Sequence, residues 1–291
     1  MDTTPSPTSP GTPTPTAPIS KYPLGTDRAE LERLHLQHRL WSDAAHALWK
    51  RAGILPGARV LDVGAGPGAA TMDLAELVTS SGAVHAVDES ERFVDHVRTQ
   101  ATARRVEQVT AHVGDVHALD ALPELAEASF DLAYARWVLC FTASPAKVVA
   151  GIARLLAPGG ALCVHDYFDY TRMTCAPRRA GYTRIVEATA RSWRDNGGDP
   201  DVVARLPRLV REAGLVLEPL EVHQRIARPG DTMWHWAASW WRSYVPRLVA
   251  MGYASEADAA AIFADLDAMT RSDDFLVLPP VYELIARRPL G

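Results

Sequence analysis

Three glycines within five residues follow directly on a short apolar run of this sequence. The run Arg59–Val63 reads RVLDV, and Gly64, Gly66 and Gly68 come next. Glycines after the first strand of a strand–turn–helix unit let a ligand approach the backbone, and the N-terminus of the following helix points toward that ligand. The spacing fits a dinucleotide as well as a nucleoside that carries an amino acid. The loop alone therefore predicts a nucleotide-like cofactor without choosing between the two.

Carboxylates at the ends of three apolar runs distinguish between these cofactors. Asp62 lies two residues before Gly64, where it would repel a pyrophosphate but would pair with the ammonium group of an amino acid. One carboxylate at Asp88 can accept from both hydroxyls of a ribose. Asp115 can accept from the amino group of an adenine, next to the backbone N–H of Val116. Each acid alone could cap a loop or a turn, but the three at successive strand ends favour S-adenosylmethionine.

Alternating strands and helices have to position these residues. From residue 58 onward, short apolar runs alternate with amphipathic stretches, which predicts βαβ units and a parallel sheet with helices on both faces. The expected parallel strands are Arg59–Val63, Ala83–Val87, Val109–Val113, Phe130–Tyr134 and Ala161–His165. Beyond residue 170 we expect helices over 178–213, a strand over 215–227, an aromatic-rich helical insert over 231–270 and a last strand at Phe275–Arg287.

Five stretches, in this order, resemble the successive motifs of class I S-adenosylmethionine-dependent methyltransferases. They are VLDVGAGPG at 60–68, HAVDES at 85–90, HVGDV at 112–116, SFDLAYARWVL at 129–139 and LLAPGGALCV at 155–164. The resemblance covers residues 59–165 and points to the branch that acts on small molecules, as in bacterial secondary metabolism. It implies an α/β, Rossmann-like, doubly wound fold with a seven-stranded sheet, mostly parallel with an antiparallel last strand, and a helical cap.

The resemblance also assigns the cofactor to the loops that follow these strands. It implies that Gly64 and Gly66 flank the methionine moiety and that Arg136 lies near the methyl group, through its backbone. Residues 21–41 resemble the N-terminal helix with which many members close over the cofactor, although an ordinary packing helix would look the same. The expected cofactor-binding residues are Asp62, Gly64, Ala65, Gly66, Asp88, Glu89, Asp115, Val116, Arg136, Tyr22 and Gln37.

Methyl transfer from a sulfonium asks the protein mainly for alignment, because the donor is already activated. A base is needed if the acceptor arrives protonated. His165 ends the fifth expected strand, at the edge of the sheet where open α/β proteins bind ligands, and its ordinary pKa near 6.5 suits proton removal. His165 is therefore the candidate base, with a histidine that merely bonds a loop as the alternative. Weaker candidates, each explained by packing or a helix surface, are His35, His38, His112, His223 and His235.

The insert over 231–270 concentrates aromatic side chains. At helical spacing, Trp234 and Trp241 share one face of a helix, and Trp236 and Trp240 share another. Two aromatic faces predict a helix that packs on one side and lines a pocket on the other, although burial of all four in the core of the cap would give the same pattern. The expected residues of the acceptor pocket are Tyr167, Trp236 and Trp240.

Composition limits the partners of the chain. A formal net charge of −5 over 291 residues gives no basic field for nucleic acid, and no apolar run approaches the roughly 18 residues of a membrane span. The three cysteines fit neither a zinc site nor a disulfide framework, so we expect reduced thiols, no metal and a cytoplasmic location. An arginine-rich stretch over 172–211 is compatible with an anionic acceptor. The sequence does not indicate an oligomeric state.

The sequence predicts an enzyme that methylates a small metabolite at oxygen, nitrogen or carbon. A cofactor-binding protein of the same fold without methyl transfer, either a cyclase or a binding module, is the first alternative. A nicotinamide oxidoreductase is disfavoured by Asp62 and by the turn Pro158-Gly159-Gly160. The expected segments are a disordered Pro/Thr/Ser-rich tail over 1–20, a helical lid over 21–57, a cofactor-binding core over 58–170, helices with a sixth strand over 171–230, an aromatic-rich cap insert over 231–274 and the last strand with the C-terminus over 275–291.

Overall fold

A mixed β-sheet forms the centre of the computed structural model, which describes residues 28–290. Its strands are β1 Arg59–Val63, β2 Ala83–Asp88, β3 Val109–Val113, β4 Phe130–Arg136, β5 Leu156–Tyr167, β7 Val216–Leu217, β8 Glu221–His223 and β11 Val281–Arg287. They lie in the order β3-β2-β1-β4-β5-β11-β7, and β8 also pairs with β11. Strands β1 to β5 are parallel to one another, whereas β11 runs antiparallel to β5. The expected mostly parallel sheet is confirmed, with eight strands among the described residues in place of seven.

Helices cover both faces of this sheet. They are α1 Arg28–Ala52, α2 Ala69–Val78, α3 Glu91–Arg104, α4 Pro145–Leu155, α5 Ala180–Asp195, α6 Leu206–Glu212, α7 Thr232–Ala250 and α8 Glu256–Met269, with short 3-10 turns η1 Val116–Ala121, η2 Leu139–Phe141, η3 Tyr170–Arg172 and η4 Val202–Ala204. Successive side chains of a strand point to opposite faces. Leu61 of β1 accordingly packs in one core with Ile152 of α4, whereas Val60 packs in another with Leu48 of α1 and Leu74 of α2. The doubly wound architecture is confirmed.

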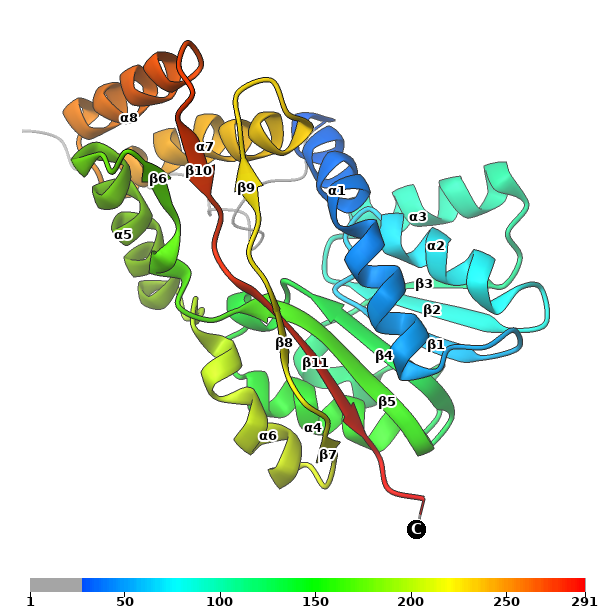
Figure 1. Cartoon of the computed structure of the whole chain (residues 1–291). Helices are drawn as coiled ribbons and strands as arrows, with labels where there is room; N and C mark the ends of the chain where they lie inside the picture. Colours follow the sequence, from blue (N-terminus) through cyan, green and yellow to red (C-terminus); the bar gives the residue numbers. More distant parts are fainter. Residues whose placement is uncertain (1–27, 291) are drawn as a thin grey trace, which may run out of the picture.

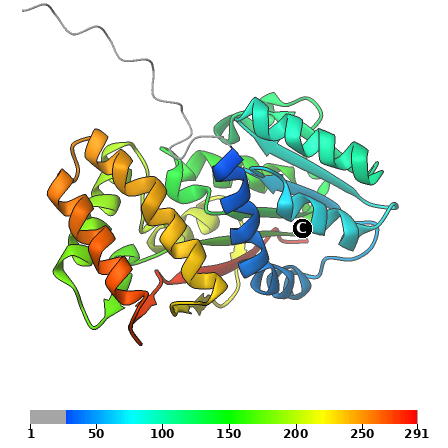
Figure 2. The same ribbon diagram turned by 90° about the horizontal axis from the view of Figure 1, so that it is seen from above.

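A helical cap built from α5, α7 and α8 stands beyond the carboxyl ends of the parallel strands (Figure 1). A second, small sheet accompanies these helices, with strands β6 Thr174–Ala176, β10 Phe275–Val277 and β9 Ile226–Ala227 in that order. Seen from above, α1 runs between the cap helix α7 and the core helix α2 (Figure 2). The lid helix therefore touches both parts of the molecule.

Two strands expected from the sequence are each divided in the structure. The segment 215–227 forms β7, β8 and β9, and Phe275–Arg287 forms β10 and β11, with the parts in two different sheets. Pro219 interrupts the first segment, and Pro279 and Pro280 interrupt the second. Proline has no N–H for a ladder hydrogen bond, so these positions end the pairing. Both single-strand predictions are therefore wrong. Prolines separate β7 from β8 and β10 from β11, whereas the step from β8 to β9 falls at Gln224 and Arg225.

The strand order reverses between β1 and β4, because the chain builds the sheet outward from β1 in both directions. Ligands of open α/β sheets bind in the crevice at such a point. Here the loop after β1 requires glycine: Gly64 has φ +65°, and a Cβ on it would lie 2.5 Å from a methyl carbon of Val138.

The expected tail over 1–20 and Tyr22 lie outside the described residues. Within 28–290, no helix has the length and apolarity to cross a membrane.

Candidate functional site

A cavity of about 510 Å³ opens at the carboxyl ends of β1 to β4 and continues beneath the cap. Of the sequence-predicted cofactor residues, those that the structure describes all line this cavity: Asp62, Gly64, Ala65, Gly66, Asp88, Glu89, Asp115, Val116, Arg136 and Gln37. The expected pocket residues Tyr167, Trp236 and Trp240 line it as well. The same cavity is therefore lined by the predicted cofactor-binding residues and by the predicted acceptor-pocket residues. Their roles remain predictions.

Asp88 joins the glycine loop to the next helix. One carboxylate oxygen accepts from the N–H of Gly66 at 2.8 Å, and the other accepts from the N–H of Ser90 at 2.9 Å. Burial raises the pKa of Asp88, and the two backbone hydrogen bonds oppose that shift. Each oxygen keeps a second lone pair, so the carboxylate can still accept from a pair of ligand hydroxyls.

Asp62 is a buried carboxylate at the end of β1. The hydroxyl of Thr71 donates to it at 2.6 Å. Burial raises the pKa of Asp62 to about 6, although this hydrogen bond and the nearby charge of Arg136 act in the opposite direction. A carboxylate in such surroundings gains from a cationic partner in the cavity, and it would disfavour a pyrophosphate.

The far end of the cavity is more open. The side chain of Asp115 is 64% exposed, and one of its oxygens accepts from the backbone N–H of His117 at 2.9 Å. At the glycine loop, Gly66 lines the cavity, and a Cβ on it would meet no protein atom within 4 Å. Bare backbone beside open space, with acids at three strand ends, fits an adenosyl group joined to an amino acid.

Aromatic side chains enclose the part of the cavity beneath the cap. They are Trp137, Phe141, Tyr167, Tyr170, Trp193, Trp236, Trp240 and Tyr244. Trp137 stacks against Tyr167 with ring centroids 6.0 Å apart, and against Trp236 at 6.3 Å. The structure thus forms an aromatic chamber from β5, η2, η3, α5, α7 and the residue that follows β4.

The two aromatic faces expected for α7 are both present. Trp236 and Trp240 line the cavity, whereas Trp241 is fully buried in the cap and donates its indole N–H to the hydroxyl of Tyr182. The sequence did not identify Trp137 or Trp193. Trp137 directly follows Arg136 in the fourth motif, which was a usable signal, but no motif fixes where α5 places Trp193.

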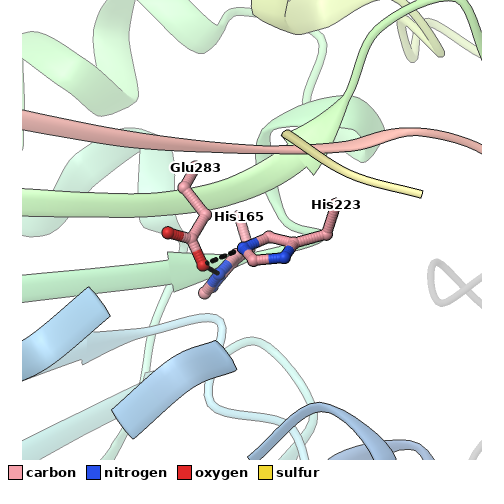
Figure 3. Close-up of side chains that lie close together, drawn as sticks. All are labelled: His165, His223 and Glu283. Carbon is pink, nitrogen blue, oxygen red and sulfur yellow. Dashed lines mark hydrogen bonds and ion pairs between the residues drawn. The ribbon is translucent and has the colours of Figure 1, made fainter. Parts of the chain in front are cut away.

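His165, the predicted base, is not among the described residues that line the cavity. Its side chain is 1% exposed, and its Nε2 lies 2.7 Å from Oε1 of Glu283 (Figure 3). Its Nδ1 lies 3.1 Å from the hydroxyl of Tyr134. Burial lowers the pKa of His165, and the hydrogen bond to Glu283 raises it by less. Both ring nitrogens are engaged inside the protein, so this position argues against a base that faces the acceptor.

Glu283 gathers basic groups from three other elements. His223 lies 2.6 Å from the same oxygen that contacts His165, and Arg51 of α1 donates to the other oxygen. Burial raises the pKa of Glu283, but the hydrogen bonds from His165 and Arg51 outweigh it and bring the pKa to about 2. The cluster ties α1, β5, β8 and β11 together.

Three potential metal ligands therefore lie within 4.8 Å of one another: His165, His223 and Glu283. Sequence spacing gave no sign of this cluster, because its members lie far apart along the chain. Two imidazoles on one carboxylate oxygen and a guanidinium on the other satisfy the carboxylate by hydrogen bonding. A divalent cation would have to displace both imidazole contacts beside the positive charge of Arg51. The absence of a metal remains a prediction.

Comparison with known proteins bears directly on this cavity. A family described as a methyltransferase domain matches residues 61–164, which include β1 to β4 and the loops that line the cavity. Aklanonic acid methyltransferase DauC of Streptomyces sp. strain C5 is 33% identical over 104 residues, which are 36% of this chain and 46% of DauC. The core of this chain belongs to the class I S-adenosylmethionine-dependent methyltransferases. S-adenosylmethionine is the cofactor of this methyltransferase core.

Solved structures share the fold of this chain over most of its length. A structure of a putative methyltransferase from Bacillus halodurans matches with a TM-score of 0.58 at 18% identity, over 84% of this chain and 98% of that one. The cyclase SpnF matches with a TM-score of 0.56 at 21% identity, over 86% of this chain and 82% of that one. Identities this low show the fold alone. The first curated relatives are matched over less than two thirds of their own length.

Proposed function

We propose that this protein transfers the methyl group of S-adenosylmethionine to a small molecule held in the aromatic chamber. The observation that carries the proposal is the continuity of the cavity from the acidic strand ends to the chamber under α7. S-adenosylmethionine supplies the activated methyl group when it is bound. The chain's own residues then have to orient the acceptor and limit its contact with water, which a preformed chamber with aromatic walls favours.

The lining of the chamber favours a neutral or weakly acidic acceptor. Carboxylates among the described lining residues belong to the strand ends, at Asp62, Asp88, Glu89 and Asp115. On the chamber side, the guanidinium carbon of Arg33 lies 5.5 Å from the ring centroid of Trp240, and its charge is balanced by the buried carboxylate of Glu30 at 2.6 Å. Flat aromatic walls suit a planar, largely apolar molecule. The name of DauC gives aklanonic acid as its substrate, which is consistent with an acidic acceptor here.

Such an acceptor reduces the need for a base. A phenol, an enol or an acidic carbon loses its proton more readily than a neutral alcohol, so alignment carries more of the reaction. We therefore place methylation at oxygen or at an activated carbon ahead of methylation at an ammonium nitrogen. A cytoplasmic location and a role in secondary metabolism accompany this proposal as predictions.

The proposal is tested by incubating the full chain with methyl-labelled S-adenosylmethionine and a panel of phenols, enolisable polyketides, carboxylic acids and amines. Mass spectrometry should find the label on an aromatic or enolic acceptor, together with an equal amount of S-adenosylhomocysteine. Trp137→Ala should lower the yield by at least tenfold, whereas Arg39→Gln on the exposed side of α1 should not. Label on the amines alone would contradict the assignment of acceptor class.

The cyclase alternative makes a different prediction with the same samples. The likeness to SpnF is one of fold, and it would gain weight if a compound in the panel were converted to an isomer of the same mass. S-adenosylmethionine would then remain unconsumed. A nicotinamide oxidoreductase would instead bind NAD, which a parallel titration detects.

A further inference from the structure

A chain of hydrogen bonds runs from α2 through the lid helix α1 to Arg136 at the cavity wall. Nε2 of His38 lies 2.9 Å from Oδ2 of Asp73, and Nδ1 of His38 lies 3.0 Å from Nη2 of Arg136. A guanidinium has donors and no acceptor, so Nδ1 of His38 accepts and Nε2 carries the proton that is donated to Asp73. Burial lowers the pKa of His38, which favours this neutral form. The tautomer of His38 is thereby fixed.

Asp73 is itself held in place from the lid. Its Oδ2 also lies 2.7 Å from Nε2 of His46, two turns further along α1. His38 and His46, both on α1, thus hydrogen-bond to the same carboxylate. The orientation of the Arg136 side chain consequently depends on α1 being docked against α2.

The guanidinium of Arg136 presents one nitrogen that the protein does not satisfy. Its Nη1 is buried and has no hydrogen-bond partner within residues 28–290, and Arg136 lines the cavity. The rings of Trp137 and Tyr134 lie 5.3 and 5.9 Å from its central carbon and restrict its movement. Leaving a buried, charged donor unpaired is costly. Because Nη1 is also closed off from the open cavity that Arg136 lines, a small turn of the guanidinium would let it meet a ligand oxygen.

The opposite charge lies on the neighbouring strand. Asp62 of β1 is paired in register with Tyr134 of β4, two residues before Arg136, and its carboxylate also lines the cavity. An anion and a cation side by side at one wall match the ammonium and carboxylate groups of an amino acid. The glycine loop that holds the methionine moiety by resemblance begins at Gly64, directly after this strand.

We propose that the guanidinium of Arg136 binds the α-carboxylate of the cofactor's methionine moiety, opposite Asp62, and that His38 and Asp73 are positioning residues that orient it. This inference rests on the proposed function. It replaces the expectation that Arg136 acts through its backbone with a role for its side chain. The site then selects nucleosides with an intact amino-acid tail, and the lid helix takes part in that selection.

Calorimetric titration of the full chain with three ligands tests the carboxylate contact. S-adenosylhomocysteine carries both tail charges, its decarboxylated analogue retains the amine alone, and 5′-methylthioadenosine lacks both. The wild type should prefer S-adenosylhomocysteine to the decarboxylated analogue by roughly 10- to 100-fold, as expected for a charge-assisted hydrogen bond. Arg136→Gln should abolish that preference while leaving the affinity for the analogue within about twofold, and Arg39→Gln should change neither.

The positioning role is tested with the same ratio of affinities, which a purely structural role would not move selectively. His38→Ala should reduce the preference for the carboxylate by about 3- to 10-fold. His38→Asn places an amide oxygen near the position of Nδ1 and should restore much of it. Asp73→Ala should act like His38→Ala, because the histidine loses the acceptor that fixes its tautomer.

The outcomes separate this inference from the proposed function. If the wild type binds S-adenosylhomocysteine but Arg136→Gln keeps the full preference, or weakens both nucleosides equally, the carboxylate assignment is overturned and the methyltransferase assignment stands. If cofactor affinities are unchanged in Arg136→Gln and only the KM for the acceptor rises, Arg136 binds the acceptor instead of the cofactor. If none of the three ligands binds the wild type, both proposals fall.

Discussion

His165 and Glu283 face each other across the antiparallel strands β5 and β11, where they are register partners with Nε2 2.7 Å from Oε1. Both side chains are 1% exposed. Because Arg51 of α1 reaches the second oxygen of Glu283, this contact fastens the lid helix to the last strand of the sheet. The polar cluster is therefore part of the scaffold that places α1 over the cavity.

Glu283→Gln should destabilise the protein by about 2–4 kcal/mol, since it leaves Arg51 and two histidines beside a neutral amide. Urea unfolding measures the change. Glu221→Gln is the matched control, because Glu221 also pairs with Arg51 but its side chain is 52% exposed. That variant should lose less than about 1 kcal/mol. Equal losses in the two variants would show that burial of the cluster is not what makes it stabilising.

His165→Asn should lower stability without changing the pH dependence of methyl transfer. The reason is placement, since His165 does not line the cavity and donates to Glu283. Rates measured at saturating cofactor and acceptor should retain the acidic limb of the wild type. A pH–rate profile that loses this limb, with a rate lower by 100-fold or more, would restore His165 as the base.

Affinity for S-adenosylhomocysteine should fall as the pH drops from 7 to 5. Burial raises the pKa of Asp62 from its ordinary 3.8 to about 6, so the carboxylate is ionised above pH 6 and becomes neutral below it. A neutral Asp62 cannot pair with the ligand's ammonium group. Titrations at several pH values should show this decline in the wild type, while Asp62→Asn binds more weakly with a shallower dependence. Parallel curves for the two proteins would contradict the pairing.

Trp236→Ala should raise the acceptor KM by about 10- to 100-fold and leave cofactor affinity within about twofold. Trp236 belongs to the cap helix α7 and stacks with Trp137 in the chamber. Initial rates at varied acceptor concentration, with a calorimetric titration of the cofactor, give both numbers. A variant that loses cofactor affinity to the same extent would show that the cap and the cofactor site are not separable.

Local sequence was sufficient for the cofactor side of the site. Asp62 and Asp88 each end an apolar run, and strand ends in a parallel sheet meet at one edge, so their convergence followed from pattern and topology. The orientation of His165 did not, because its contact with Glu283 depends on a strand that pairs from the other end of the chain. The bond between His38 and Asp73 likewise joins two helices, and no periodicity within either one encodes it.

The acceptor side was accessible from sequence only in part. Helical spacing separated Trp236 from Trp241 correctly, because both lie on one helix. Trp193 reaches the chamber from α5, whose position is set by its packing against the other helices of the cap. Packing of this kind follows from contacts among distant segments, which a single sequence does not display.

Calorimetric titration of the full chain with S-adenosylhomocysteine tests the central claim, that the cavity at the carboxyl ends of β1 to β4 is the site of an S-adenosyl cofactor. We expect a micromolar Kd in the wild type, no measurable binding of NAD, and a loss of roughly 2–4 kcal/mol in Asp88→Ala, because two charge-assisted hydrogen bonds to the ribose disappear. Wild-type affinity in Asp88→Ala, or binding of NAD in preference to S-adenosylhomocysteine, would contradict it.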